Sequence, residues 1–118
     1  MKNQPILHRL QFALDGLRVV WNSERSFRTE CGFAVAAVIA LVVLRPGWHW
    51  AAMIAICTAL VMALELLNSA LEYLIDHIHP DISPAIKHSK DAAAAAVLVA
   101  SAGSVCVAAL MLLSVLFG

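Results

Sequence analysis

Three acids and an amide recur at helical spacing near the end of a long apolar stretch. Asn68, Glu72 and Asp76 follow Glu65 by 3, 7 and 11 residues. At about 100° per residue these positions form one narrow stripe along a helix, and Ser69 borders it. Ionisable side chains in an apolar segment are costly, so the stripe indicates a functional site. Hydrogen bonding between helices is an alternative role for Asn68 and Ser69, but it leaves three aligned acids unexplained.

The depth of this stripe in a membrane favours one kind of chemistry. If Trp50 marks one interface, Glu65 lies about 22 Å and Glu72 about 33 Å along the helix. In a hydrocarbon core of about 30 Å, the stripe therefore crosses the far interface and not the midplane. A proton-coupled transporter is expected to hold its acid near the midplane, whereas an enzyme acting on lipid headgroups needs its acids at the interface.

Further charged residues are expected at the same interface. A hairpin between the second and third apolar segments brings Glu72 level with about Lys90, which Asp91 follows directly, and Glu24 and Glu30 begin the first apolar segment. Several carboxylates with few cations require a divalent ion, and oxygen ligands beside a lysine suit Mg²⁺ carrying phosphates. This combination predicts phosphoryl transfer. The sequence contains neither a GxxxxGK(S/T) nor a GxGxxG phosphate loop.

The elements that must position these side chains are membrane helices. The chain has 118 residues, of which 62% are hydrophobic and 14% charged. A soluble domain of this size cannot bury so much apolar surface. The zero net charge gives no reason to expect nucleic-acid binding. We predict an all-α membrane protein with a surface helix over 1–22 and transmembrane helices over 26–45, 49–78 and 84–117.

The N-terminal stretch differs from the three apolar segments because it is amphipathic. Its polar face carries His8, Arg9, Gln11, Asp15 and Arg18. Such a helix lies along a membrane surface, or alternatively packs against a soluble partner. Ser23 can cap the next helix, which places Glu24 in its first turn. Ser83 and Pro84 have the residue types of an N-cap and first helical residue for the last helix.

The basic residues predict the orientation of the chain in the membrane. One side carries Lys2, Arg9, Arg18, Arg25, Arg28, Lys87 and Lys90, and the other carries only Arg45. We therefore expect a cytoplasmic N-terminus and an outside C-terminus.

Two other residue types are less informative. Cys31, Cys57 and Cys106 fit no metal motif or disulfide framework, and we expect them to be small buried hydrophobic residues. A His-x-His pair can bind metal, but a solvated or nucleotide-contacting turn is the favoured interpretation of His77, His79 and His88.

Three stretches carry a resemblance to a known family: GLRVVWNSERSFRTE (16–30), ELLNSALEYLID (65–76) and KDAAAAAVLVA (90–100). Over nearly its whole length the chain resembles the prokaryotic diacylglycerol kinases, a family of small integral membrane lipid kinases. The resemblance implies transfer of the γ-phosphate of MgATP to the hydroxyl of diacylglycerol, giving phosphatidic acid. It also implies one kinase domain over 1–118 and a homotrimer with shared active sites in the cytoplasmic (inner) membrane.

The resemblance implies roles for individual residues. Glu65 matches the catalytic base and Asn68 a polar residue beside it, while Glu24 and Glu72 match ligands of the Mg²⁺ that accompanies ATP. The other residues matched to the nucleotide site are Phe12, Asp76, Lys90 and Asp91. The residues matched to the lipid substrate are Arg9, Arg28, Glu30, Glu65 and Ala94.

The sequence departs from the diacylglycerol kinase pattern after Lys90 and Asp91. Ala93 and Ala94 stand where Gly and Ser are usual, and the run KDAAAAAV is closer to that of the undecaprenol kinases of the same family. In the N-terminal helix, either His8 or Arg9 could supply the family's basic residue. The lipid therefore stays open between diacylglycerol and undecaprenol. An oligomeric proton-coupled transporter and a non-catalytic membrane adaptor are the alternatives from other classes.

Overall fold

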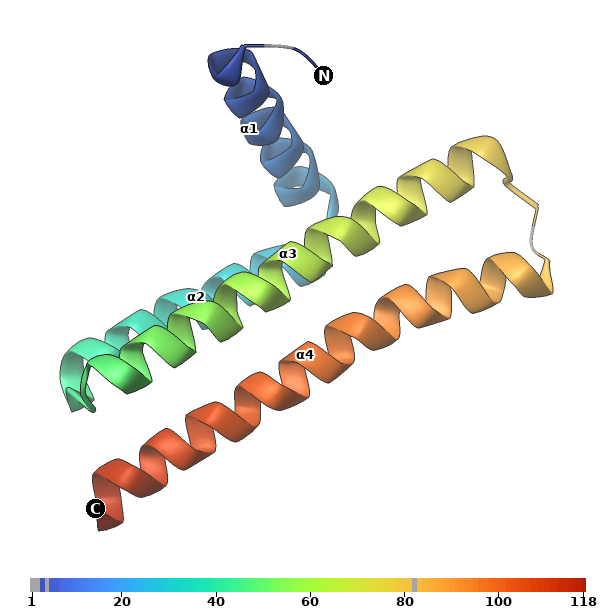
Figure 1. The fold of residues 1–118 in the computed structure, drawn as a ribbon. Helices are drawn as coiled ribbons and strands as arrows, with labels where there is room; N and C mark the ends of the chain where they lie inside the picture. The colour runs from blue at the N-terminus through green and yellow to red at the C-terminus, as the bar shows by residue number, and fades with distance from the viewer. Residues whose placement is uncertain (1–2, 4, 82) are drawn as a thin grey trace.

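The computed structural model describes residue 3 and residues 5–81 and 83–118. Lys2, counted above for the orientation, lies outside them. The described chain forms four helices: α1 (Ile6–Ser23), α2 (Arg25–Leu44), α3 (Trp48–Ile78) and α4 (Pro84–Phe117) (Figure 1). The last three are long and apolar enough to cross a membrane. The predicted all-α membrane architecture is therefore confirmed.

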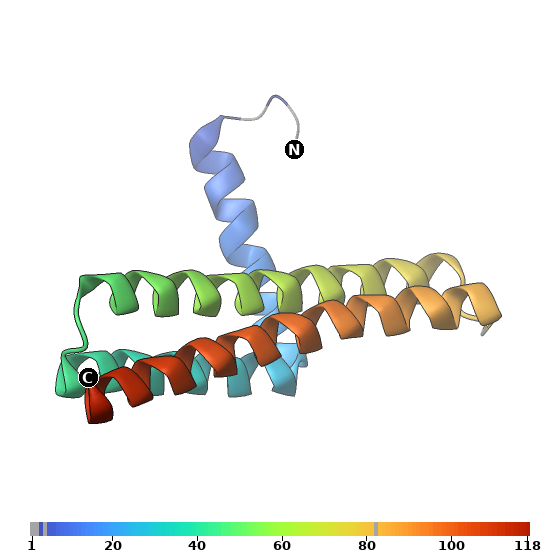
Figure 2. The ribbon, with the colours of Figure 1, turned by 60° about the horizontal axis from the view of Figure 1, so that its bottom comes forward.

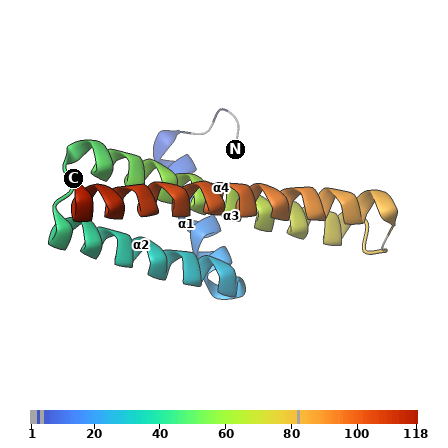
Figure 3. The same cartoon turned by 90° about the horizontal axis from the view of Figure 1, so that it is seen from below.

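The three apolar helices run alongside one another in alternating directions, and α1 projects away from them (Figures 1 and 2). With 31 residues in α3 and 20 in α2, α3 exceeds α2 by about 16 Å at a rise of 1.5 Å per residue. Seen from below, α3 and α4 continue together past the start of α2 (Figure 3). We call this end, residues 72–78 and 84–91, the α3–α4 overhang.

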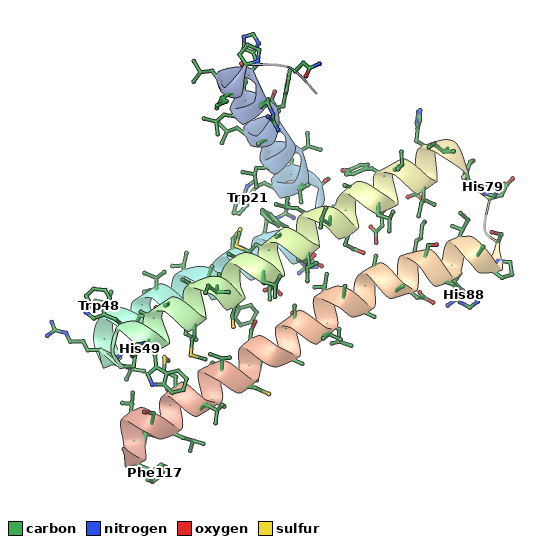
Figure 4. All side chains as sticks on the ribbon, in the orientation of Figure 1. Trp21, Trp48, His49, His79, His88 and Phe117 are labelled. Atoms are coloured by element: carbon green, nitrogen blue, oxygen red, sulfur yellow. The ribbon has the colours of Figure 1, made fainter. Side chains whose placement is uncertain are left out.

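The two ends of the long helices differ in character. Trp48 and His49 lie at the end where α2 turns into α3, while His79 and His88 lie at the overhang (Figure 4). Trp48 is 90% exposed, as expected for an aromatic residue in a membrane interface. The turn before it uses a left-handed Arg45 and a Gly47 with φ of 111°, a conformation that favours glycine.

The start of α4 follows the predicted pattern. The backbone N–H of Ile86 donates to the Ser83 hydroxyl at 3.3 Å, and Pro84 is the first helical residue. This bond satisfies one of the N–H groups that a helix leaves unpaired at its start.

The corner between α1 and α2 consists of Glu24 alone, in an extended conformation with φ −114° and ψ 108°. The predicted capping role of Ser23 is wrong. Ser23 still belongs to α1, and its hydroxyl turns back to donate to the carbonyl of Val19 at 2.8 Å. Glu24 is the N-cap residue instead, and among the described residues its side chain makes no capping hydrogen bond.

Burial within one chain is sparse and partly concentrated at this corner. Val20 and Phe27, on either side of the corner, are buried, as are Glu65 and Ser69 one turn apart on α3. Most large apolar side chains are exposed, which suits helices surrounded by lipid or by further copies. The expectation of buried cysteines is not met, because Cys31 and Cys57 are only half-buried and Cys106 is exposed on α4.

Candidate functional site

Glu65 is the centre of the predicted site and lies among other acids. Its side chain is only 8% exposed, although α3 is predominantly apolar around it. The carboxylates of Glu30, Glu24 and Glu72 lie within electrostatic range of it. Acids from α2, the α1–α2 corner and α3 therefore all act electrostatically on Glu65.

A polar pocket connects Glu65 to the start of α2. A cavity of about 270 Å³ is lined by Arg25, Ser26, Thr29, Glu30 and Glu65. The first three residues were not among the predicted site residues. The sequence offered a signal for Ser26, because it precedes Glu30 by four residues and therefore lies on the same face of the helix as that predicted site residue. Arg25 had been counted only as a charge that sets the orientation.

Asn68 contacts Glu72 in the structure. Its Nδ2 atom donates to Oε1 of Glu72 at 3.3 Å, one turn further along α3. Its Oδ1 atom is buried and has no hydrogen-bond partner among the described residues. A buried oxygen without a hydrogen-bond donor lowers the stability of the fold. Here that oxygen belongs to Asn68, whose amide nitrogen binds the Glu72 carboxylate. This local arrangement suits a cation near Glu72.

The described residues contain no group of three or more His, Cys, Asp or Glu side chains that could hold a metal ion by themselves. Metal binding by His77, His79 and His88, the less favoured interpretation of these residues, therefore gains no support among the described residues. Mg²⁺ in phosphoryl-transfer sites commonly uses one or two carboxylates together with substrate phosphates and water. Glu24 and Glu72 fit that pattern, because a nucleotide would supply the remaining oxygens.

The overhang carries two close ion pairs. Nζ of Lys90 lies 2.5 Å from Oδ1 of Asp76 and joins α4 to α3, while Nζ of Lys87 lies 2.6 Å from Oδ2 of Asp91 within α4. Lys90 was expected level with Glu72, and its partner is one turn further along α3. Ala94 follows Lys90 by one turn and is exposed.

The remaining predicted residues lie on α1 and at the start of α2. Nη1 of Arg28 donates to the carbonyls of Trp21 at 2.6 Å and Asn22 at 3.4 Å, so Arg28 fastens α2 to the end of α1. Arg9 and Phe12 are exposed on α1. Within the part of the chain that the structure describes, no hydrogen bond or ion pair joins these two to the carboxylates.

Acids near one end of a helical membrane bundle, with a lysine on the facing helix, are the residue types that a membrane phosphotransferase uses. Residues 11–112 match the family model of prokaryotic diacylglycerol kinase. The chain belongs to this family and is a membrane lipid kinase. All of the predicted site residues except Arg9 fall inside the matched range.

Named relatives agree with the family. The chain is 34% identical over 109 residues to a diacylglycerol kinase of Synechocystis sp., covering 92% of this chain and 62% of that relative. It is 30% identical over 95 residues to the Haemophilus influenzae diacylglycerol kinase, covering 80% of each. The Escherichia coli diacylglycerol kinase is 32% identical over 95 residues, with 80% of this chain and 78% of the relative covered. The chain thus spans less than two thirds of the Synechocystis protein.

Proposed function

We propose that the chain transfers the γ-phosphate of MgATP to the hydroxyl of diacylglycerol, giving phosphatidic acid and ADP. The observation that carries the proposal is the buried Glu65, which lines a polar pocket and lies within electrostatic range of three other carboxylates. The relatives named diacylglycerol kinase favour this lipid over undecaprenol.

Glu65 acts as the general base in the proposed reaction. It accepts the proton of the lipid hydroxyl while that oxygen attacks the γ-phosphorus. The bond between the γ-phosphorus and the β,γ-bridging oxygen breaks, and ADP leaves with the bond's electron pair. The burial of Glu65 keeps bulk water away from the attacking oxygen, which limits hydrolysis of ATP.

Charge on the phosphates is neutralised from two sides. Glu24 and Glu72 would hold the Mg²⁺ that accompanies ATP, and Asn68 orients Glu72 through its hydrogen bond. Lys90 lies on the facing helix and exchanges its contact with Asp76 for a contact with phosphate. Phe12 and Asp91 complete the proposed nucleotide contacts. The proposed lipid contacts are Arg9, Arg28, Glu30 and Ala94.

The kinase works in the inner membrane as a homotrimer in this proposal, with 1–118 as one domain. The N-terminus faces the cytoplasm and the C-terminus faces outward, which puts the overhang and its lysines on the side that contains ATP. The exposed apolar faces of α2, α3 and α4 support association, as does the projection of α1 away from the other three helices (Figure 1). A neighbouring subunit can bring its Arg9 and Phe12 to the site.

The test is transfer of labelled phosphate from MgATP in mixed micelles, with diacylglycerol and undecaprenol compared side by side. We expect faster transfer to diacylglycerol and loss of transfer in Glu65→Gln. Faster transfer to undecaprenol would replace the lipid in the proposal. Transfer to neither lipid would contradict the proposal and favour the alternative functions, a transporter or an adaptor.

A further inference from the structure

Tyr73 links α3 to the α1–α2 corner. Its hydroxyl donates to Oγ of Ser23 at 2.5 Å, across 50 residues of sequence. The Ser23 hydroxyl donates in turn to the carbonyl of Val19 at 2.8 Å. Among the described residues, only this bond and the Lys90–Asp76 pair join α3 to another helix through side-chain hydrogen bonds. We call the hydrogen bond from Tyr73 to Ser23 the clasp.

The clasp lies beside both proposed magnesium ligands in the sequence. Ser23 directly precedes Glu24, and Tyr73 directly follows Glu72. We propose that Tyr73 and Ser23 are positioning residues that set the separation of Glu24 and Glu72, and thereby the affinity for a nucleotide-bound divalent cation. This inference rests on the proposed function, because it assumes that these two carboxylates share the cation.

The clasp matters for the position of Glu24 because the connection between α1 and α2 is so short. Glu24 is the only residue between α1 and α2, so a change in the angle between these helices moves its carboxylate directly. Arg28 fastens α1 to α2, but it makes no link to α3 among the described hydrogen bonds. The hydroxyl of Tyr73 is therefore the side-chain hydrogen-bond donor that holds the corner against the helix carrying Glu72.

Interface anchoring is the simpler role for Tyr73. Its side chain is 47% exposed, and aromatic residues favour the membrane–water boundary. Anchoring depends mainly on the ring, which Tyr73→Phe keeps. The clasp depends on the hydroxyl, which Tyr73→Phe removes, and equally on Ser23. The two roles therefore predict different behaviour for variants at these positions.

The test measures cation affinity without turnover. Mn²⁺ is titrated by electron paramagnetic resonance into the purified protein in mixed micelles with β,γ-methylene-ATP, which cannot transfer its terminal phosphate. We expect Tyr73→Phe and Ser23→Ala each to raise the Kd about 3- to 10-fold, the range for loss of one neutral hydrogen bond. The Kd of the double variant should not exceed the higher of the two single-variant Kd values, because both changes remove the same hydrogen bond. Ser23→Thr keeps a hydroxyl and should bind like the original protein.

Steady-state kinetics give a second reading of the same effect. The KM for MgATP should rise by a similar factor in Tyr73→Phe and Ser23→Ala. The kcat at saturating MgATP and the KM for the lipid should stay unchanged. General loosening of the fold would lower kcat and the unfolding temperature as well.

Matched controls separate the possible failures. Ser104→Ala removes a hydroxyl that donates within its own helix to Ala100 at 2.8 Å, and it should not change the Kd. If Glu72→Gln leaves Mn²⁺ affinity unchanged, the proposed metal site is wrong. If Glu72→Gln weakens binding while Tyr73→Phe and Ser23→Ala do not, the clasp is overturned and the proposed function stands. Additive effects of the two single changes would also overturn the clasp.

Discussion

Nζ of Lys90 lies 2.5 Å from Oδ1 of Asp76, which joins α4 to α3 in the overhang. The Lys90 side chain is 35% exposed and that of Asp76 is 64% exposed. An ion pair this open to solvent contributes only about 0.2–1 kcal/mol to stability. The pair is therefore easily exchanged, and a triphosphate, whose negative charge exceeds that of one carboxylate, can displace Asp76 as the partner of Lys90.

Exchanging the two charges tests this relationship. The double variant Asp76→Lys with Lys90→Asp keeps an ion pair, so its unfolding temperature should match that of the original protein. Its phosphate transfer should fall about 10²- to 10³-fold, because the cation now lies on the wrong helix. Lys90→Met should lose as much activity. Full activity in the exchanged variant would show that Lys90 serves only the ion pair.

Replacing Glu65 by glutamine should remove turnover while preserving the fold. The amide has the size of the carboxylate but cannot accept the hydroxyl proton, so kcat should fall about 10²- to 10⁴-fold. Affinity for MgATP and the unfolding temperature should remain the same. Glu30→Gln is the comparison, because it alters a neighbouring acid in the same pocket and should change the KM for lipid more than kcat. Undiminished turnover in Glu65→Gln would remove Glu65 from its assigned role.

Chelation of divalent ions should abolish phosphate transfer, and added Mg²⁺ should restore it. In Glu72→Gln, the Mg²⁺ concentration for half-maximal rate should rise at least about 10-fold, because one anionic ligand is lost. Asn68→Ala should shift it in the same direction but less, since it removes only the residue that orients Glu72. Titration of Mg²⁺ at fixed ATP measures both effects. Equal Mg²⁺ dependence in all three proteins would exclude Glu72 as a ligand.

Arg28→Ala should loosen the α1–α2 corner. The guanidinium bonds to the Trp21 and Asn22 carbonyls are exposed, so their loss should cost about 1 kcal/mol. Limited proteolysis should then cut the chain between α1 and α2 faster, and Arg28→Lys should rescue little because lysine lacks the fork of donors. Unchanged cleavage together with a raised KM for lipid would assign Arg28 to substrate binding alone.

Local sequence signals predicted the features that depend on local chemistry. Three long apolar stretches and one amphipathic stretch became four helices, because helix periodicity and apolar length act within each segment. Ser83 caps α4 as expected, since its partner Ile86 lies only three residues away. The placement of Glu65, Asn68 and Glu72 on one helix followed from spacing alone.

Contacts between residues on different helices were not predicted from the sequence. Ser23 had the residue type of an N-cap, but its hydroxyl remained within α1 and received a hydrogen bond from Tyr73, 50 residues away. The partner of Lys90 depends on the register of α4 against α3, which the turn between them sets, and the register favours Asp76 over Glu72. Arg25 and Thr29 line the pocket only because α2 packs beside that part of α3.

The overhang has a consequence for the kinetics of the proposed kinase. Its lysines extend past the start of α2, while Glu65 stays within the apolar bundle, so the two substrates reach the site from different phases. ATP diffuses in three dimensions, whereas the lipid moves within a two-dimensional sheet. The rate should consequently follow the mole fraction of lipid substrate in the bilayer and not its amount per volume of solution. Dilution with inert lipid should slow the enzyme, whereas dilution with water should act only through ATP.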